Sequence, residues 1–251
     1  MGTASGEVAR ISGGEVVNRG QRHAGRVRFV QHGTNAEDTS VYSGGDDGRV
    51  FSDDRLLWKH TGGVCAGVMT PHGLLTSGAD ARARLGTADL KKPASKKFGS
   101  RPLTALALLE DGRVVMAATG GWLRVLSLPA LTVERDFRFQ AAGSVIALAA
   151  LEAGEFFALT LHGTSCWDLS FEEWQAERTA SYQELQSSIN REWTACAGGA
   201  AGLMYATEGG VEWADKGFLP SEPLPSAIAG VERQIFLGTP QGEVRAFEYQ
   251  G

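Results

Sequence analysis

Two sets of side chains near the start of the chain combine a histidine, a serine and an aspartate, the residue types of a nucleophilic triad. The members are His23, Ser43 and Asp46 or Asp47 in the first set, and His60, Ser77 and Asp80 in the second. A hydrolase needs one triad, whereas these sets recur at the spacing of a sequence repeat. We therefore interpret them as polar networks that satisfy one another inside repeated structural units.

The residues around the first set predict short strands and tight turns. The stretch from Ser43 to Leu57, SGGDDGRVFSDDRLL, is typical of two strands joined by a turn. Asp46-Asp47-Gly48 supplies residue types that tolerate turn geometry. The chain holds 33 glycines without a collagen period or a low-complexity tract. So much glycine indicates many turns and hence many short strands.

Related phrases recur along the whole chain. They begin at residues 6, 48, 82, 122, 164, 210 and 242, a period that is near the length of one four-stranded propeller blade, about 40 residues. Most repeats place two nearly apolar strands first and a more polar strand last. This gradient favours a blade whose inner strands line a packed hub while its last strand meets water.

Several of these phrases resemble WD40 repeats: HAGRVRFV, SGGDDGRVF, HTGGVCAGVM and LLTSGADARARL. The family pattern runs His-x-Gly, then Ser-Gly-x-Asp-Gly, then a strand that ends in Trp-Asp. Trp167-Asp168 keeps the closing pair, Trp213 keeps the tryptophan, and Gly86 and Leu126 stand at that position elsewhere. The resemblance covers nearly the whole chain and is sharpest from about residue 23 to residue 86. It implies that the two polar sets are structural tetrads of His, Ser or Thr, Asp and Trp.

The expected fold is all-β, with residues 1–251 forming a single β-propeller of four-stranded antiparallel blades. Five complete units and separate strands at the two ends predict six blades, with seven as the alternative. We expect the N-terminal strand Glu15–Arg22 to pair with strands from 227–249 and so to close the ring. This count leaves one strand too many, so residues 1–12 are either peripheral or a fifth strand at the seam.

One segment departs from the repeat. Residues 171–192 contain no glycine or proline, and a helical insertion is expected at about 180–191. Its apolar residues lie at spacings compatible with one helical face: Phe171, Trp174, Tyr182, Leu185 and Ile189. Two interpretations stay open, an elongated loop packed on its own blade or a partner-docking element that uses Trp174 and Tyr182.

Two surface features are candidates for partner binding. The densest basic cluster is Lys91, Lys92, Lys96, Lys97 and Arg101. Lysines on an outer strand protect an exposed edge, and they also suit contact with an acidic protein or a nucleic acid. Phe98 is the only aromatic residue there, which weakens the nucleic-acid interpretation. Trp122 follows Gly120-Gly121 in a predicted turn, where it is either an interface anchor or packed within its blade.

The composition of the chain excludes several functional classes and indicates a cellular location. The net charge of −5 argues against a general nucleic-acid binder. Cys65, Cys166 and Cys196 are scattered in apolar runs, which favours buried free thiols and a cytoplasmic or nuclear location. We expect no membrane span, no signal peptide and no cofactor. The sequence has no phosphate-cradling glycine loop, zinc-ligand spacing or nucleophile elbow.

The resemblance implies a non-catalytic WD40-like scaffold that holds other protein subunits within a larger complex, with no small-molecule substrate. One alternative is an incomplete propeller that a partner strand completes. The other is a hydrolase-like or lactonase-like enzyme with a metal in the central channel. That enzyme would need carboxylates, asparagines or histidines from several blades at the axis, whereas the predicted innermost strands offer mainly Val, Leu, Ala and Gly.

Overall fold

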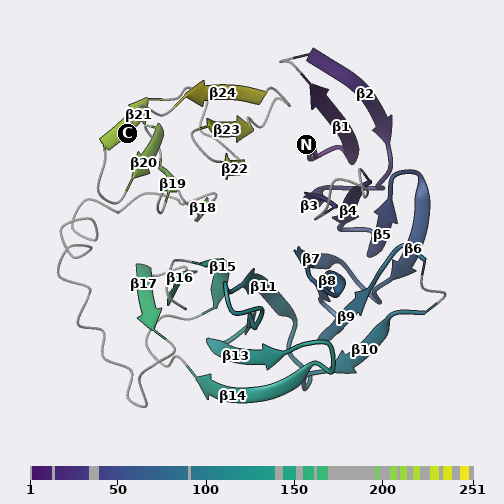
Figure 1. Ribbon diagram of the computed structural model, residues 1–251, viewed down its shortest axis with the longest axis vertical. Helices are drawn as coiled ribbons and strands as arrows, with labels where there is room; N and C mark the ends of the chain where they lie inside the picture. The colour runs from purple at the N-terminus through teal and green to yellow at the C-terminus, as the bar shows by residue number, and fades with distance from the viewer. Residues whose placement is uncertain are drawn as a thin grey trace. The chain divides into compact units, whose positions relative to one another are not determined.

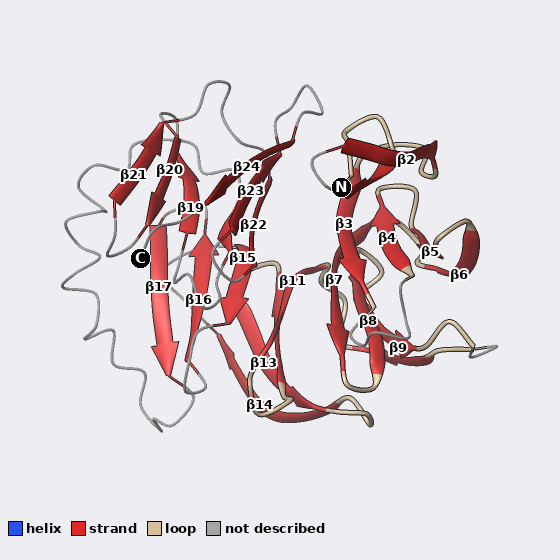
Figure 2. Ribbon diagram, turned by 45° about the horizontal axis from the view of Figure 1, so that its top comes forward, coloured by secondary structure: helices blue, strands red, loops and turns tan. Residues whose placement is uncertain are grey.

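The structure is a computed structural model, and all its described regular elements are β-strands (Figure 2); the strand pairs with a described register run antiparallel. This agrees with the all-β prediction. The chain divides into two units, residues 1–108 with 112–145 and residues 109–111 with 146–251, and each is described by itself. The described residues are 2–12, 15–33, 40–89, 92–138, 144–150, 155–160, 163–168, 196–197, 204–207, 210–213, 217–220, 227–231, 234–238 and 244–248.

The first unit contains one two-stranded sheet and three four-stranded sheets, and each sheet keeps its strands in chain order (Figure 1). The two-stranded sheet is β1 (Glu7–Ser12) and β2 (Glu15–Gln21). The first four-stranded sheet is β3 (Val27–His32), β4 (Val41–Gly45), β5 (Arg49–Ser52) and β6 (Arg55–Lys59). The second is β7 (Val64–Thr70), β8 (Gly73–Gly78), β9 (Arg82–Gly86) and β10 (Ala94–Lys97). The third is β11 (Leu103–Leu108), β12 (Val114–Ala118), β13 (Trp122–Ser127) and β14 (Thr132–Arg138).

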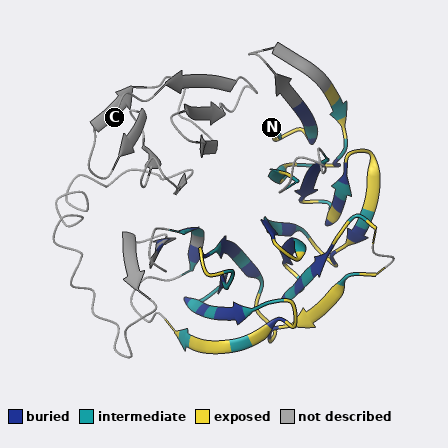
Figure 3. Ribbon diagram, viewed as in Figure 1, coloured by how far each residue is buried: buried dark blue, intermediate teal, exposed yellow. Residues whose placement is uncertain are grey.

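Burial falls from the inner strands of these sheets to the outer ones. Every residue of β4 and of β12 is buried, whereas every residue of β10 is exposed and β14 is mostly exposed (Figure 3). The first strands of neighbouring sheets pack side by side, β3 beside β7 and β7 beside β11. The polarity gradient in the sequence therefore reports which strands lie inside.

Apolar packing between sheets supplies most of the stability. A cluster that includes Leu75, Leu103, Met116 and Leu126 joins the second and third sheets. Truncating one buried leucine to alanine typically costs about 2–5 kcal/mol. An exposed ion pair such as Arg19–Glu7 contributes much less, because water screens the two charges. The core, and not the surface charge pairs, therefore holds the sheets together.

Two glycines make room for an aromatic ring between the first and second sheets. Phe29 on β3 lies where side chains at Gly44 and Gly67 would stand, and a Cβ atom at Gly67 would come 2.5 Å from the ring. Such a distance is far below van der Waals contact, so a larger residue at either position would displace the ring. The glycines of β4 and β7 thus serve packing between sheets rather than turns.

The second unit contains a three-stranded, a four-stranded and another three-stranded sheet. The first is β15 (Val145–Ala150), β16 (Glu155–Thr160) and β17 (Gly163–Asp168). The second is β18 (Cys196–Ala197), β19 (Met204–Thr207), β20 (Gly210–Trp213) and β21 (Gly217–Pro220). The third is β22 (Ala227–Val231), β23 (Gln234–Gly238) and β24 (Val244–Glu248). The helical insertion predicted at 180–191 lies outside the described residues.

The terminal strands are described in two separate sheets. β2 pairs with β1 over a register that runs from Glu7–Gln21 to Ser12–Glu15, so residues 7–12 belong to a sheet. β22, β23 and β24 pair with one another. Closure of a ring by these two sheets, and the number of blades, stay predictions.

Candidate functional site: the histidine networks

The same backbone hydrogen bond recurs just after three outer strands of the first unit, β2, β6 and β10. The N–H of His23 donates to Gly6 O at 3.0 Å, that of His60 to Gly48 O at 2.8 Å, and that of Phe98 to Ala81 O at 2.8 Å. The three acceptor residues share a positive φ, of 97°, 75° and 59°. Each of these three strands is therefore followed by a residue that a left-handed turn of the same sheet holds in place, and the side chain of that residue reaches toward the next sheet.

The first network is centred on His23, which is 1% exposed. Its Nδ1 lies 3.0 Å from Asp47 Oδ1, and its Nε2 lies 3.0 Å from Ser43 Oγ. A carboxylate only accepts hydrogen bonds, so in the neutral ring Nδ1–H donates to Asp47 and Nε2 accepts from the Ser43 hydroxyl. The edge of the ring also meets Phe51, with centroids 5.2 Å apart and an interplanar angle of 81°.

Asp47, and not Asp46, is the aspartate of this network. Its carboxylate also accepts the backbone N–H groups of Ala24 and Arg49, each at 3.1 Å. Asp46 is exposed and accepts a hydrogen bond from Arg28. The sequence did not decide between Asp46 and Asp47. In the structure, the turn directs Asp47 inward and Asp46 toward solvent.

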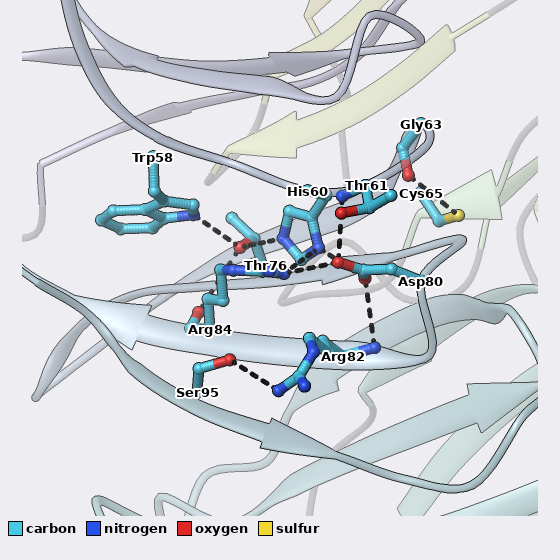
Figure 4. A network of polar contacts seen from close by, with 10 residues as sticks. All are labelled: Trp58, His60, Thr61, Gly63, Cys65, Thr76, Asp80, Arg82, Arg84 and Ser95. Atoms are coloured by element: carbon cyan, nitrogen blue, oxygen red, sulfur yellow. Dashed lines mark hydrogen bonds and ion pairs between the residues drawn. The ribbon is translucent and has the colours of Figure 1, made fainter.

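The second network repeats the first around His60, which is 1% exposed (Figure 4). Its Nδ1 lies 2.9 Å from Asp80 Oδ1, and its Nε2 lies 3.0 Å from Thr76 Oγ1. The Asp80 carboxylate also accepts the backbone N–H groups of Thr61 at 3.1 Å and Arg82 at 3.2 Å. A histidine that follows the first sheet is thereby bonded to two residues of the second.

The prediction that Ser77 fills this place is corrected to Thr76. Side chains alternate between the faces of a strand, so neighbours on β8 point in opposite directions. Ser77 Oγ is buried, and it has no hydrogen-bond partner within the described part of the chain. Thr76 precedes Asp80 by four residues, as Ser43 precedes Asp47. Counting back from the aspartate would have found it.

Two members of the second network escaped the sequence analysis. Trp58, on the outer strand β6 of the first sheet, donates its indole N–H to Thr76 Oγ1 at 3.1 Å. Arg84 Nη1 donates to Asp80 Oδ2 at 2.9 Å and also contacts His60 Nδ1. Arg84 follows Asp80 by four residues, as Phe51 follows Asp47, so equal spacing was the available signal. The hydrogen bond from Trp58 joins two different sheets, so no local sequence pattern predicts it.

Glycine precedes each network aspartate by two residues, and the rings explain why. A Cβ atom at Gly45 would lie 2.7 Å from His23 Nδ1, and one at Gly78 would collide with His60 Nδ1. The imidazole therefore packs directly on the backbone of the second strand. This close approach is the physical reason for the glycine at the third position of Ser-Gly-Gly-Asp-Asp and of Thr-Ser-Gly-Ala-Asp.

Electrostatics fixes the charge state of the second network. Burial of Asp80 opposes its ionisation, but the hydrogen bond and charge of His60, together with Arg84, lower its pKa from 3.8 to about 2. Burial lowers the pKa of His60, and the charge of Arg84 adds to this shift against the effect of Asp80. In the first network, burial likewise opposes ionisation of Asp47, but hydrogen bonds from His23 and the backbone lower its pKa. At neutral pH, Asp80 is thus a carboxylate beside a neutral His60.

Aspartate, histidine and hydroxyl are linked in the order of a nucleophilic triad, but the hydroxyl groups are not placed where a nucleophile must be. Ser43 and Thr76 are each 0% exposed, and Thr76 already receives the indole N–H of Trp58. A nucleophile must reach the substrate, and these hydroxyls face only the protein interior. The arrangement ties neighbouring sheets together.

The third sheet replaces the polar network by apolar packing. Phe98 stands where His23 and His60 stand, and Met116 and Gly120 occupy the hydroxyl and aspartate positions. Phe98 and Met116 are buried in the core cluster. Arg124, at the position of Arg84, donates instead to Phe98 O at 3.0 Å and to Asp136 Oδ2 at 3.1 Å.

The remaining predicted residues lie at several places. Lys92, Lys96, Lys97 and Arg101 are exposed, and Lys96 Nζ donates to Leu131 O at 2.9 Å. Trp122 is half-buried against the core. Trp167 and Asp168 lie on β17, opposite Phe156 and Glu155 of β16. Lys91, Trp174 and Tyr182 lie outside the described residues.

Cys65 is half-buried with a free thiol whose pKa is raised by burial.

Two further features are absent from the part of the chain that the structure describes. There, no three His, Cys, Asp or Glu side chains group as metal ligands would. None of the described segments forms a helix long and apolar enough to cross a membrane. In comparisons with known proteins, the chain matches no family model and no curated protein.

Proposed function

We propose that this protein is a non-catalytic WD40-like β-propeller scaffold that holds other proteins within a larger complex. The observation that carries the proposal is the repeated His–Asp–hydroxyl network at equivalent positions of two successive sheets. Its polar groups are buried and occupied by one another, so they stabilise a frame instead of reacting with a substrate. A rigid frame with many short surface turns suits partner binding.

Six blades are proposed for the ring, with seven as the alternative. Gly6 makes the backbone bond that Gly48 and Ala81 make, which supports β1 and β2 as the third and fourth strands of a repeat. Over the described residues, the C-terminal sheet consists of the three strands β22, β23 and β24. Closure by β1 and β2 would give that sheet β2 as its outer strand, and the sheet at the seam would then carry five strands.

The proposed partners are protein subunits, and the proposed location is the cytoplasm or the nucleus. The free thiol of Cys65 suits a reducing compartment. The net charge of −5 does not favour general attraction to nucleic acid.

Affinity purification of the tagged full chain after mild crosslinking, read by quantitative mass spectrometry, tests the scaffold. We expect at least one protein to co-purify in a stoichiometric ratio that a tag-only control does not reproduce. Metal analysis of the same preparation separates the enzyme alternative. A bound stoichiometric metal together with no co-purifying protein would overturn the proposal.

A further inference from the structure

A half-buried tryptophan of the third sheet lies against two arginines. Trp122 and Arg138 are cross-strand partners in the β13–β14 ladder. The guanidinium carbon of Arg138 lies 5.9 Å from the Trp122 ring centroid, and that of Arg124 lies 5.6 Å from it. Cation–π contacts of this kind hold both guanidinium groups near the ring. Because Trp122 packs on the core, it is a rigid support for them.

Residues on the last strand of the second sheet and just after it bring further positive charge to the same place. Lys96 Nζ lies 5.6 Å from the Phe98 ring centroid, and the guanidinium carbon of Arg124 lies 6.0 Å from it. Arg101 lies beside the turn before Trp122, because a Cβ atom at Gly120 would come 2.9 Å from Arg101 Nη1. We call this set the basic–aromatic surface; its members are Lys96, Arg101, Trp122, Arg124 and Arg138.

Little negative charge balances this surface. Asp136 pairs with Arg124 at 3.1 Å, and the nearby Glu134 pairs with Arg113 at 3.5 Å. Among the residues that the structure describes, Arg101 and Arg138 have no ion-pair partner, and Lys96 is bonded only to a backbone carbonyl. Arg101, Arg138 and Lys96 are exposed. Uncompensated cations therefore gather here, although the chain as a whole carries −5.

The chemistry favours carboxylates over nucleic acid as the ligand. Arginine guanidinium groups bind carboxylates through paired hydrogen bonds. Proteins that bind single strands stack bases on open aromatic rings, whereas Trp122 is half-buried and already contacts two arginines. The net negative charge also opposes the approach of a long polyanion. We propose that the basic–aromatic surface binds an acidic segment, rich in glutamate or aspartate, of a partner protein; this rests on the proposed scaffold function.

The test measures fluorescence anisotropy of a labelled oligoglutamate peptide with the full chain, and an oligoglutamine peptide serves as the neutral probe. Binding of oligoglutamate alone is expected, and it should weaken as salt is raised to physiological strength, where the Debye length is about 8 Å. The double variant Arg101→Gln/Arg138→Gln should bind about tenfold more weakly, because two exposed contacts are lost.

The matched control is Arg49→Gln/Lys59→Gln, which removes two exposed cations from the first sheet. It changes the net charge equally and should leave oligoglutamate affinity within about twofold. If both variants lost oligoglutamate affinity equally, the loss would come from the change in net charge alone, and the inference would be overturned. Thermal unfolding of both variants should match that of the parent, because the altered side chains are exposed.

Two further outcomes separate this inference from its rivals. An oligodeoxythymidine that loses binding in Arg101→Gln/Arg138→Gln, while oligoglutamate does not, would assign the surface to nucleic acid and overturn the inference. A co-purifying protein that binds this variant as well as the parent would also overturn it, yet would leave the scaffold proposal standing. Loss of that protein's binding in this variant alone is the supporting result.

Discussion

His60 shows what a single side chain contributes to this fold. Its ring nitrogens bond to Asp80 in one direction and to Thr76 in the other, and its side chain is buried. Removing the ring takes one hydrogen bond from Thr76 and one from Asp80, although each keeps its other partners. Depriving buried polar groups of a partner in this way costs about 1–3 kcal/mol, which exceeds the net worth of an average hydrogen bond.

We predict that His60→Ala lowers the free energy of unfolding by about 1–3 kcal/mol. Urea denaturation followed by tryptophan fluorescence measures it. The control is His72→Ala, since His72 is exposed in the turn between β7 and β8 and should change stability by less than about 0.5 kcal/mol. An unchanged urea midpoint for His60→Ala would contradict the structural role of the network.

The charge states of the second network predict a loss of stability in acid. The folded pKa of His60 lies below 6.5, so the unfolded chain binds a proton first and stability falls as pH drops below that value. The folded pKa of Asp80 is about 2 against 3.8, so its contribution is complete above 3.8 and disappears as pH falls toward about 2. Both groups therefore lower the free energy of unfolding as the pH falls.

The measurement is urea unfolding of the parent and of Asp80→Asn at a series of acidic pH values. Because the asparagine cannot ionise, the parent should be more stable near neutral pH. The difference between the two proteins should shrink as pH falls from 3.8 toward about 2. A difference that stays constant over this range would show that the Asp80 charge does not stabilise the fold.

At the scale of the element, the turn between β4 and β5 combines two constraints at Gly48. Its φ is 75°, and a Cβ atom there would collide with the carbonyl oxygen of Gly62 and come 2.5 Å from that of His60. Gly112 has a similar φ of 82° but nothing within 4 Å of the corresponding position. Comparing Gly48 with Gly112 therefore separates the effect of a positive φ from the effect of close contact with neighbouring atoms.

Gly48→Ala should therefore destabilise the protein by about 1 kcal/mol or more beyond Gly112→Ala. Both substitutions carry the left-handed penalty of about 1–2 kcal/mol, and only the first also displaces the backbone around His60. Thermal and urea unfolding of the two variants provide the comparison. Equal losses would mean that the turn relaxes freely around the new methyl group.

The elements were largely predictable, whereas the contacts between them were not. Glycine-rich turns and apolar runs located the strands of the first unit, because turn geometry and strand burial act locally. The repeat that begins at Trp122 was predictable, whereas the apolar contacts of the third sheet were not, because Phe98 and Met116 look like any core residues once they replace a histidine and a hydroxyl. The Trp122–Arg138 pair depends on the β13–β14 register, which shifts between Val125 and Leu126. No residue pattern discloses that shift.

At the scale of the whole molecule, the first 22 residues hold the start of the first four-stranded sheet. Gly6 O accepts the N–H of His23, and Thr3 O accepts that of Val27. Deleting residues 1–22 removes β1, β2 and both contacts, and it leaves strand edges unpaired. We expect the truncated protein to be less stable and to aggregate or capture partners.

Size-exclusion chromatography with light scattering and thermal unfolding measure this outcome, and adding a peptide of residues 1–22 should restore part of the loss. A truncated protein that stays monomeric, soluble and as stable as the parent would rule out closure by these strands. It would favour an open ring that a strand of another chain completes.

The junctions between sheets should also differ in how they respond to cold. His60 takes its backbone bond from the first four-stranded sheet and bonds through its ring to Thr76 and Asp80 of the second. Phe98 takes its backbone bond from the second sheet, and its ring meets the third sheet through apolar packing, with one hydrogen bond from Arg124 to its carbonyl oxygen. Apolar association weakens on cooling, because near room temperature its driving force is entropic. Near freezing, the junction at Phe98 should therefore loosen first, and amide hydrogens there should exchange sooner than those around His60.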